Sequence, residues 1–175
     1  MEASFRQSIH LEYLTAMTEA VLTERETPLA VGDIAPDFTL PDQDKNDVTL
    51  SELLKKGEVV LCFFPLAFSP ICSTEMTCIT EDLDKYAGNG ATVLGISADS
   101  FFTLKAWAEQ LGLKQTLLAD MHRKVAKAYG MYFEPLNISG RGTFVIGTDG
   151  KVKWAQVREL GDGMDREEVL AAVAG

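Results

Sequence analysis

The sequence predicts an α/β domain built on a central mixed sheet with helices on both faces. The apolar run VVLCFF at Val59–Phe64 has the length and composition of a strand buried on both faces. Strand-like and helix-like segments alternate through the middle of the chain, as they do where helices join parallel strands. Near the C-terminus, two further strand-like segments flank TDGK at 148–151, a sequence typical of a hairpin turn.

An extra helix is predicted before the domain, so that residues 1–27 form a helical extension and residues 28–175 a single domain. Apolar residues recur every four positions from Phe5 to Val21, which places them in one stripe along a helix. The stripe ends before the polar stretch TERETP. The pattern is compatible with a helix that packs on its own domain and with one that contacts a second subunit.

Within the domain, local composition and cap residues define the remaining elements. A short hairpin is expected at 37–40 and 48–50, and a helix capped by Ser51 follows it. The further expected elements are a strand at 59–64, a helix at 70–87, a strand at 91–97, a helix at 101–111, a strand at 116–119, a helix at 125–129, strands at 143–146 and 152–157, and a last helix at 166–174 capped by Asp165.

The net charge and the cysteine content limit the partners, the location and the thiol chemistry that we expect. The chain has 175 residues and a formal net charge of −10, so we expect neither nucleic acid nor an anionic membrane surface as a partner. The N-terminus lacks the pattern of a signal peptide, and no apolar run is long enough to span a bilayer. We therefore expect a cytoplasmic protein, in which the three cysteines are thiols that pack, bind a metal or react.

Cys72 is the cysteine whose position favours reactivity. It follows the predicted central strand, and Ser69 and Pro70 are residues preferred at the first positions of a helix. Cys72 then lies in the first turn, where free backbone N–H groups and the helix dipole stabilise a thiolate. Cys62, inside the apolar strand, is expected to be a packing residue.

Two separated motifs carry a family resemblance. PLAFSPIC, Pro65 to Cys72, has the pattern Pro-x-x-x-Ser-x-x-Cys and resembles the active-site signature of the peroxiredoxins. RGTFVI, Arg141 to Ile146, is similar to the segment that carries the active-site arginine of that family. The likeness extends from VGDIAPDFTL at 31–40 to about residue 160, and it is greatest to the alkyl hydroperoxide reductase E type, with the bacterioferritin comigratory protein type as the alternative.

The resemblance implies a thioredoxin-like fold and a thiol-dependent peroxidase of hydrogen peroxide and alkyl hydroperoxides, with no cofactor and no metal. It implies that Cys72 attacks the peroxide and becomes a sulfenic acid. Arg141 would stabilise the thiolate and the leaving oxygen, and the Ser69 hydroxyl would bind the peroxide. Pro65 would shield the thiolate from water. Glu75 matches an acidic position of the subgroup and would hold Arg141 through a charged pair.

Regeneration of Cys72 is left open between two routes. Cys78 is a possible resolving residue, but it lies six residues after Cys72, which separates the two by roughly 120° around a helix and by ~9 Å along it. A disulfide between them would require the first turns to unwind. Otherwise a small thiol or a thioredoxin- or glutaredoxin-like protein would reduce Cys72. The resemblance also implies a homodimer.

Other classes of function are less well supported. His10 and His122 are the only histidines, and neither has ligand spacing to the cysteines or a context typical of a catalytic base. A disulfide reductase would need Cys-x-x-Cys, but Glu75 occupies the third position after Cys72. A peroxide sensor or a chaperone with the same fold is the alternative that remains, and sustained turnover of peroxide would distinguish the enzyme from it.

Overall fold

The computed structural model describes residues 22–175. The predicted helix at 5–22 lies outside these residues except for its last position, so the extension and the domain boundary stay predictions. Along the described chain the elements are β1 (Thr39–Pro41), β2 (Asp47–Thr49), α2 (Leu50–Leu54), β3 (Glu58–Phe63), α3 (Pro70–Gly88), β4 (Ala91–Ser97), α4 (Phe101–Leu111), β5 (Thr116–Ala119), α5 (Lys124–Ala128), β6 (Tyr132–Phe133), the 3-10 helix η1 (Glu134–Leu136), β7 (Ile138–Ser139), β8 (Arg141–Ile146), β9 (Val152–Arg158) and α6 (Arg166–Ala174).

The central sheet is mixed, as predicted. Its strand order is β5-β4-β3-β8-β9, in which β3, β4 and β5 are parallel and β8 and β9 are antiparallel to their neighbours. The pairing of β3 with β8 places Phe63 opposite Gly142. Because of this register, the end of β3 that leads to Cys72 lies beside the start of β8, where Arg141 is located.

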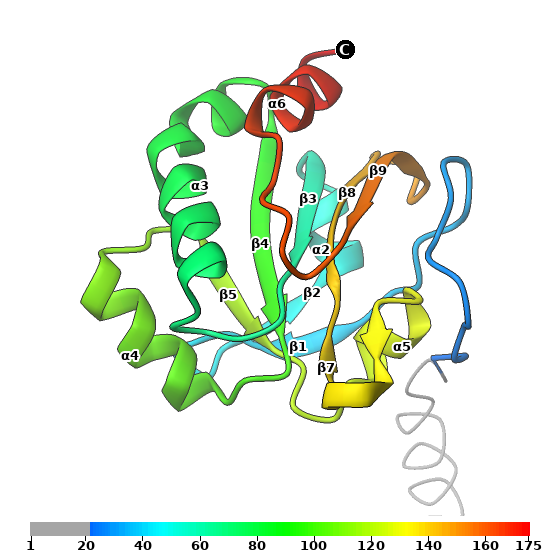
Figure 1. Cartoon of the computed structure of the whole chain (residues 1–175). Helices are drawn as coiled ribbons and strands as arrows, with labels where there is room; N and C mark the ends of the chain where they lie inside the picture. The colour runs from blue at the N-terminus through cyan, green and yellow to red at the C-terminus, as the bar shows by residue number, and fades with distance from the viewer. Residues whose placement is uncertain (1–21) are drawn as a thin grey trace, which may run out of the picture.

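Helices cover both faces of the sheet, and two apolar cores result (Figure 1). Val60, Cys62 and Phe64 contribute to the core beneath α3, α4 and α6. Val59, Leu61 and the other alternate residues of β3 face the second core, under α2, α5 and the β1–β2 hairpin. This alternation explains why the sequence of β3 is apolar throughout, since neither face is exposed to water.

Several helix ends match the sequence patterns. Ser69 and Pro70 occupy the N-cap and first position of α3. Asp165 caps α6 and accepts hydrogen bonds from the backbone N–H groups of Glu167 and Glu168. None of the helices within residues 22–175 is long and apolar enough to cross a membrane.

Two local expectations are corrected, and one element was not predicted. Helix α2 begins at Leu50 with Thr49 at its N-cap, not with Ser51 as the cap. The reason is a tertiary contact, because the carboxylate of Asp37 accepts the backbone N–H of Ser51 at 2.9 Å and so replaces a local cap. Strand β8 begins at Arg141, two residues before the expected start, and the short β6–β7 hairpin has no clear sequence signal.

Candidate active site

Cys72 lies in the first turn of α3, directly after the loop that leaves β3. Its side chain is fully buried, with 0% exposure. The first helical hydrogen bond runs from the N–H of Ser73 to the carbonyl of Ser69 at 2.9 Å. The N–H groups of the preceding residues have no carbonyl within the helix to bind. Cys72 therefore combines burial with the positive end of a helix of 19 residues.

Arg141 reaches Cys72 from β8. One Nη2–H of Arg141 points at the Cys72 sulfur, with 3.5 Å between Nη2 and Sγ. The guanidinium is fixed on its other sides, because Nε and Nη2 donate to the carbonyl of Leu160 at 3.2 and 3.0 Å and Nη1 donates to the Glu75 carboxylate. The Arg141 side chain is 3% exposed. The structure thus brings a fixed cation and a thiol together in a site closed to bulk water.

Glu75 lies between two arginines rather than beside one. Its second carboxylate oxygen accepts from Nη2 of Arg158 at 3.2 Å, and Arg158 also donates to Thr143 and Gln156 at 3.2 and 3.0 Å. Sequence analysis missed Arg158. It lies directly opposite Arg141 in the pairing of β8 with β9, so a correct register for this hairpin would have found it, but a bulge near Val145 disturbs that register.

Burial dominates the electrostatics of this group. It raises the pKa of Glu75, and the nearby positive charges of Arg158 and Arg141 oppose the shift. Burial also lowers the pKa of Arg158, which Glu75 opposes in turn. The charged forms of Glu75 and Arg158 are therefore each unfavourable in this buried position, and the opposite charge beside each of them stabilises it.

Ser69 and Pro65 line the loop that precedes Cys72. Pro65 is buried, as expected for a residue that shields the thiol. Ser69 is at the N-cap position, but its hydroxyl does not cap the helix. The Ser69 oxygen is buried and has no hydrogen-bond partner within residues 22–175. A buried hydroxyl without a partner is unfavourable by itself, and it is available to a ligand at this position.

The other two cysteines lie in different environments. Cys62 is 3% exposed, and burial raises its pKa to about 12, so it is a packing residue as predicted. Cys78 is half-buried and lines a cavity of about 330 Å³ with Thr74, Met164 and Arg166. Helix α3 is continuous from Pro70 to Gly88. Cys72 contacts Arg141 and does not line this cavity, although Glu75 and the first two residues of α3 do.

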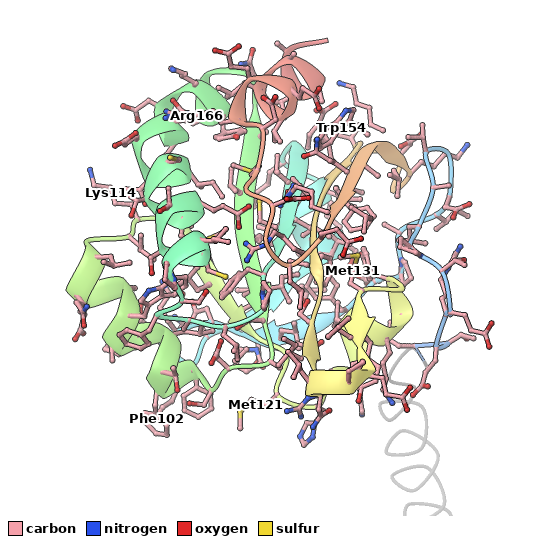
Figure 2. All side chains as sticks on the ribbon, viewed as in Figure 1. Phe102, Lys114, Met121, Met131, Trp154 and Arg166 are labelled. Carbon is pink, nitrogen blue, oxygen red and sulfur yellow. The ribbon has the colours of Figure 1, made fainter. Side chains whose placement is uncertain are left out.

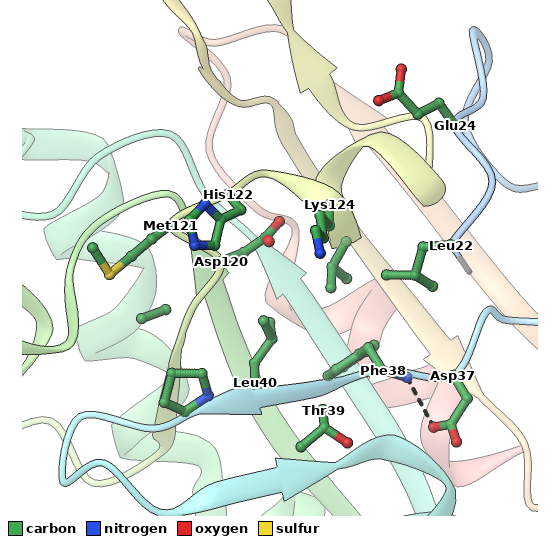
Figure 3. A pocket seen from close by; sticks show the side chains of 13 residues that line it. Leu22, Glu24, Asp37, Phe38, Thr39, Leu40, Asp120, Met121, His122 and Lys124 are labelled. Atoms are coloured by element: carbon green, nitrogen blue, oxygen red, sulfur yellow. Dashed lines mark hydrogen bonds between the residues drawn. The ribbon is translucent and has the colours of Figure 1, made fainter. Parts of the chain in front are cut away.

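A larger cavity of about 840 Å³ lies away from Cys72 (Figure 3). Its walls include Phe38 and Leu40 from the β1 region and Val125 from α5, so it belongs to the face of the sheet opposite α3. His122 is exposed and lines this cavity rather than the thiol site. Within the described residues, no group of three or more His, Cys, Asp or Glu side chains could hold a metal ion.

Comparison with known proteins gives concordant likenesses. A model of the AhpC/TSA family matches residues 31–155. Alkyl hydroperoxide reductase E of Mycobacterium tuberculosis is 38% identical over 150 residues, or 83% of this chain and 98% of the relative. The 2-Cys peroxiredoxin BAS1 of Hordeum vulgare is 33% identical over 84% of this chain and 74% of the relative.

Solved structures show the same likeness. Peroxidoxin BcpB from Mycobacterium tuberculosis superposes with a TM-score of 0.77 at 33% identity, over 83% of this chain and 96% of that one. The reduced 2-Cys peroxiredoxin of Plasmodium vivax gives a TM-score of 0.77 at 30% identity, over 83% of this chain and 81% of that one.

Proposed function

Because the chain belongs to the AhpC/TSA family and is a thiol-dependent peroxidase of the peroxiredoxin type, we propose that Cys72 is the residue that reduces the peroxide. The fold is thioredoxin-like, as predicted. The observation that carries the assignment is the contact of 3.5 Å between Arg141 Nη2 and the fully buried Cys72 sulfur. Cys62 is buried without such a contact to a cation, and Cys78 is only half-buried.

The proposed reaction begins with the Cys72 thiolate. Its sulfur attacks one oxygen of hydrogen peroxide or of an alkyl hydroperoxide, an S–O bond forms and the O–O bond breaks. The second oxygen leaves as hydroxide or alkoxide and takes up a proton to become water or an alcohol. Cys72 is then a sulfenic acid. The leaving oxygen gains negative charge, so a cation fixed beside it lowers the barrier.

Each predicted site residue has a place in this reaction. The Arg141 guanidinium is directed at the sulfur and can donate to the peroxide as charge develops. The unpaired Ser69 hydroxyl can donate to or accept from the peroxide oxygens. Pro65 has no backbone N–H and covers the thiol. Glu75 is a positioning residue, since it binds Arg141 and Arg158 rather than the thiol.

The buried charges of the site do not cancel. Arg141 and Arg158 bring two positive charges, and Glu75 brings one negative charge. The side chains are at most 7% exposed, so water screens them little. The three side chains together carry one net positive charge, and we propose that this charge stabilises the negative charge that develops on the leaving oxygen.

For regeneration we propose an outside thiol, supplied by a small molecule or by a thioredoxin- or glutaredoxin-like protein. Cys78 lines a cavity that Cys72 does not line, and two contacts hold the intervening helix. Trp107 Nε1 donates to the Ser73 hydroxyl at 3.3 Å, and Gln115 donates to the Met76 carbonyl at 3.0 Å. Both would have to break before Cys72 met Cys78.

Intact mass after one equivalent of hydrogen peroxide tests both proposals, with the reacted cysteine mapped by peptide. Gain of one oxygen at Cys72, or a mixed disulfide there with an added thiol, is the expected result. Loss of two hydrogens shared by Cys72 and Cys78 would overturn the outside-thiol proposal while keeping the peroxidatic one. Failure of Cys72 to react would overturn the assignment of Cys72. Continued consumption of peroxide with excess thiol would exclude a single-use sensor.

We also propose that two copies pair along the edge that carries the loops after β3, β4 and β5. Apolar side chains are exposed after each of these strands, namely Phe68 at 47%, Phe102 in the first turn of α4 at 64% and Met121 at 42%. Carboxyl ends of neighbouring parallel strands meet at one edge, and Phe102 and Met121 both project there (Figure 2). Sedimentation of the wild type and of Phe102→Glu tests this: a dimer that the substitution weakens is expected, and a monomeric wild type would contradict it.

A cytoplasmic location is likewise a proposal. It rests on the acidic composition, with a formal net charge of −10. Cell fractionation with the full-length chain is the direct measurement, and recovery in a membrane or exported fraction would contradict it.

A further inference from the structure

The loop from Pro65 to Ser69 has a shape that its own residues do not explain. Phe68 has a φ of 64°, in the left-handed region that a bulky side chain adopts only at a cost. The only backbone hydrogen bond across the turn, among those described for residues 22–175, joins Ser69 N–H to the Leu66 carbonyl at a long 3.5 Å. Something outside the loop must therefore hold it.

Asp99 supplies the strongest polar contact to this loop. Its Oδ2 accepts the backbone N–H of Ala67 at 2.8 Å. The same oxygen accepts the hydroxyl of Ser97 at 2.8 Å, and that hydroxyl accepts the N–H of Asp99 at 3.2 Å. Asp99 is therefore fixed by its own strand end before it binds the loop, as a residue with a positioning role would need to be.

The contact continues the pairing of β3 with β4 beyond the sheet. Phe64 N–H donates to the Ile96 carbonyl at 3.0 Å, and the side chain of Asp99 binds the N–H of Ala67 three residues later. Trp107 packs on Phe68 with ring centroids 6.3 Å apart. The loop is thus held by a carboxylate at Ala67 and by an aromatic contact at Phe68, immediately before the unpaired Ser69 hydroxyl.

We propose that Asp99 is a positioning residue for peroxide binding, because its carboxylate holds Ala67 so that the strained turn at Phe68 directs the Ser69 hydroxyl toward the site. The inference rests on the proposed role of Cys72. Asp99 acts from the end of β4, whereas Arg141 approaches the Cys72 sulfur from β8 with Glu75 and Arg158 behind it. Removal of Asp99 therefore displaces Ser69 and leaves the charged group in place.

Two reactions of Cys72 separate positioning from charge. Both reagents must enter the same buried site, but iodoacetamide alkylates the Cys72 sulfur without using the Ser69 hydroxyl, whereas hydrogen peroxide also uses it. In Asp99→Ala we expect the second-order rate constant with hydrogen peroxide to fall about 10- to 100-fold, the usual consequence of misplacing a reacting group by about 1 Å. The rate with iodoacetamide and its pH profile should stay as in the wild type.

Two further substitutions complete the series. Asp99→Asn keeps an oxygen that can accept from Ala67, and its peroxide rate should stay within about threefold of the wild type. Asp99→Glu keeps the charge but adds a methylene, so the contact of 2.8 Å requires the loop to move, and the peroxide rate should fall as in Asp99→Ala. If Asp99→Ala does not fold, the Asn and Glu variants carry the test.

Asp149→Ala is the matched control. Asp149 also accepts a backbone N–H in a loop, from Lys151 at 3.0 Å. It lies in the β8–β9 turn, at the end of β8 opposite Arg141. We expect its rates with both reagents to equal those of the wild type.

Either of two results would overturn the proposal. The Ala and Glu variants could retain the wild-type peroxide rate. Alternatively, the peroxide and iodoacetamide rates could fall together or the pH profile could move, in which case Asp99 would act through the fold or the charge of Cys72. Failure of the proposed function is a different observation, since a wild-type Cys72 that peroxide does not oxidise would show it before any variant is made.

Discussion

Removal of the Glu75 charge should destabilise the protein and slow its reaction with peroxide. Glu75 is 5% exposed, and its partners Arg141 and Arg158 are 3% and 7% exposed. Glu75→Gln keeps the shape of the side chain but leaves two guanidinium groups without their shared carboxylate. Burial raises the pKa of Glu75, so its carboxylate is itself costly to bury. The loss of stability in Glu75→Gln therefore comes mainly from the two buried guanidinium groups that no longer have a negative partner.

The expected magnitude follows from the burial of all three groups. Breaking a buried ion pair by removing one partner costs about 3–5 kcal/mol, and the retained amide oxygen places this substitution near the lower end, at about 3 kcal/mol. In a chain of this length each kcal/mol corresponds to about 2–4 °C in Tm. Thermal unfolding should therefore show a decrease of about 6–12 °C. Stopped-flow oxidation of Cys72 should slow at least about tenfold, because Arg141 loses its orientation.

Glu52→Gln is the matched control for this substitution. Glu52 also pairs with a cation, Lys55, but both side chains are more than half exposed, at 64% and 67%. Exposed pairs contribute about 0–1 kcal/mol, so Tm and the peroxide rate should hardly change. An effect of Glu75→Gln as small as that of Glu52→Gln would refute the reasoning, since it would mean that the two arginines do not depend on the carboxylate.

Three further predictions concern the scaffold. Burial raises the pKa of Asp120 from 3.8 to about 6, so its stabilising contribution is present at low pH and lost as the pH rises through that value. Relative to Asp120→Asn, the unfolding free energy of the wild type in urea should fall by about 1.5 kcal/mol from about pH 5 to about pH 7.5, and a constant difference would contradict this. A Cβ at Gly95 would lie 2.8 Å from a leucine methyl of β5, whereas nothing lies within 4 Å of a Cβ at Gly88. In thermal unfolding, Gly95→Ala should destabilise the protein by about 1–3 kcal/mol and Gly88→Ala should stabilise it by up to about 1 kcal/mol. Equal effects of the two substitutions would argue against tight packing at Gly95. Gln115→Met removes a buried hydrogen bond to the Met76 carbonyl and should cost about 1–3 kcal/mol, with faster hydrogen exchange in the first turns of α3; unchanged exchange would show that this bond does not hold the helix.

Local sequence patterns predicted the position of Cys72 in the first turn of a helix. The apolar run of β3, the cap at Ser69 and Pro70 at the first helical position all act within a few residues of Cys72. Such preferences depend on neighbouring backbone geometry, so the sequence alone places Cys72 in a first turn. Arg141 and Glu75 were reached through the family resemblance rather than through local chemistry, and the contacts between them agree with it.

Arg158 and Asp99 show why the rest was not predictable. Arg158 is 83 residues from Glu75, and Asp99 is 32 residues from Ala67. An arginine in a strand and an aspartate after a strand are ordinary surface residues by composition. Only the order and register of the sheet bring one beneath the helix and the other against the loop. The failed cap at Ser51 has the same origin, because Asp37 supplies the missing acceptor from another element.

The same geometry explains how the site can place a cation beside the thiol and still hold that cation in one position. A reactive thiolate needs nearby cations, but a cation that can move also binds water and leaving groups indiscriminately. Here Arg141 is held by the Leu160 carbonyl and by Glu75, so its remaining donor points at the sulfur. Ser69, which we propose binds the peroxide, follows a loop that is held by a different contact, from Asp99 to the backbone of Ala67. The charge is supported from β8 and β9, and the proposed binding position is supported from the end of β4, on the other side of β3. Substitutions should therefore alter one without the other, and the paired rates with peroxide and iodoacetamide measure that independence directly.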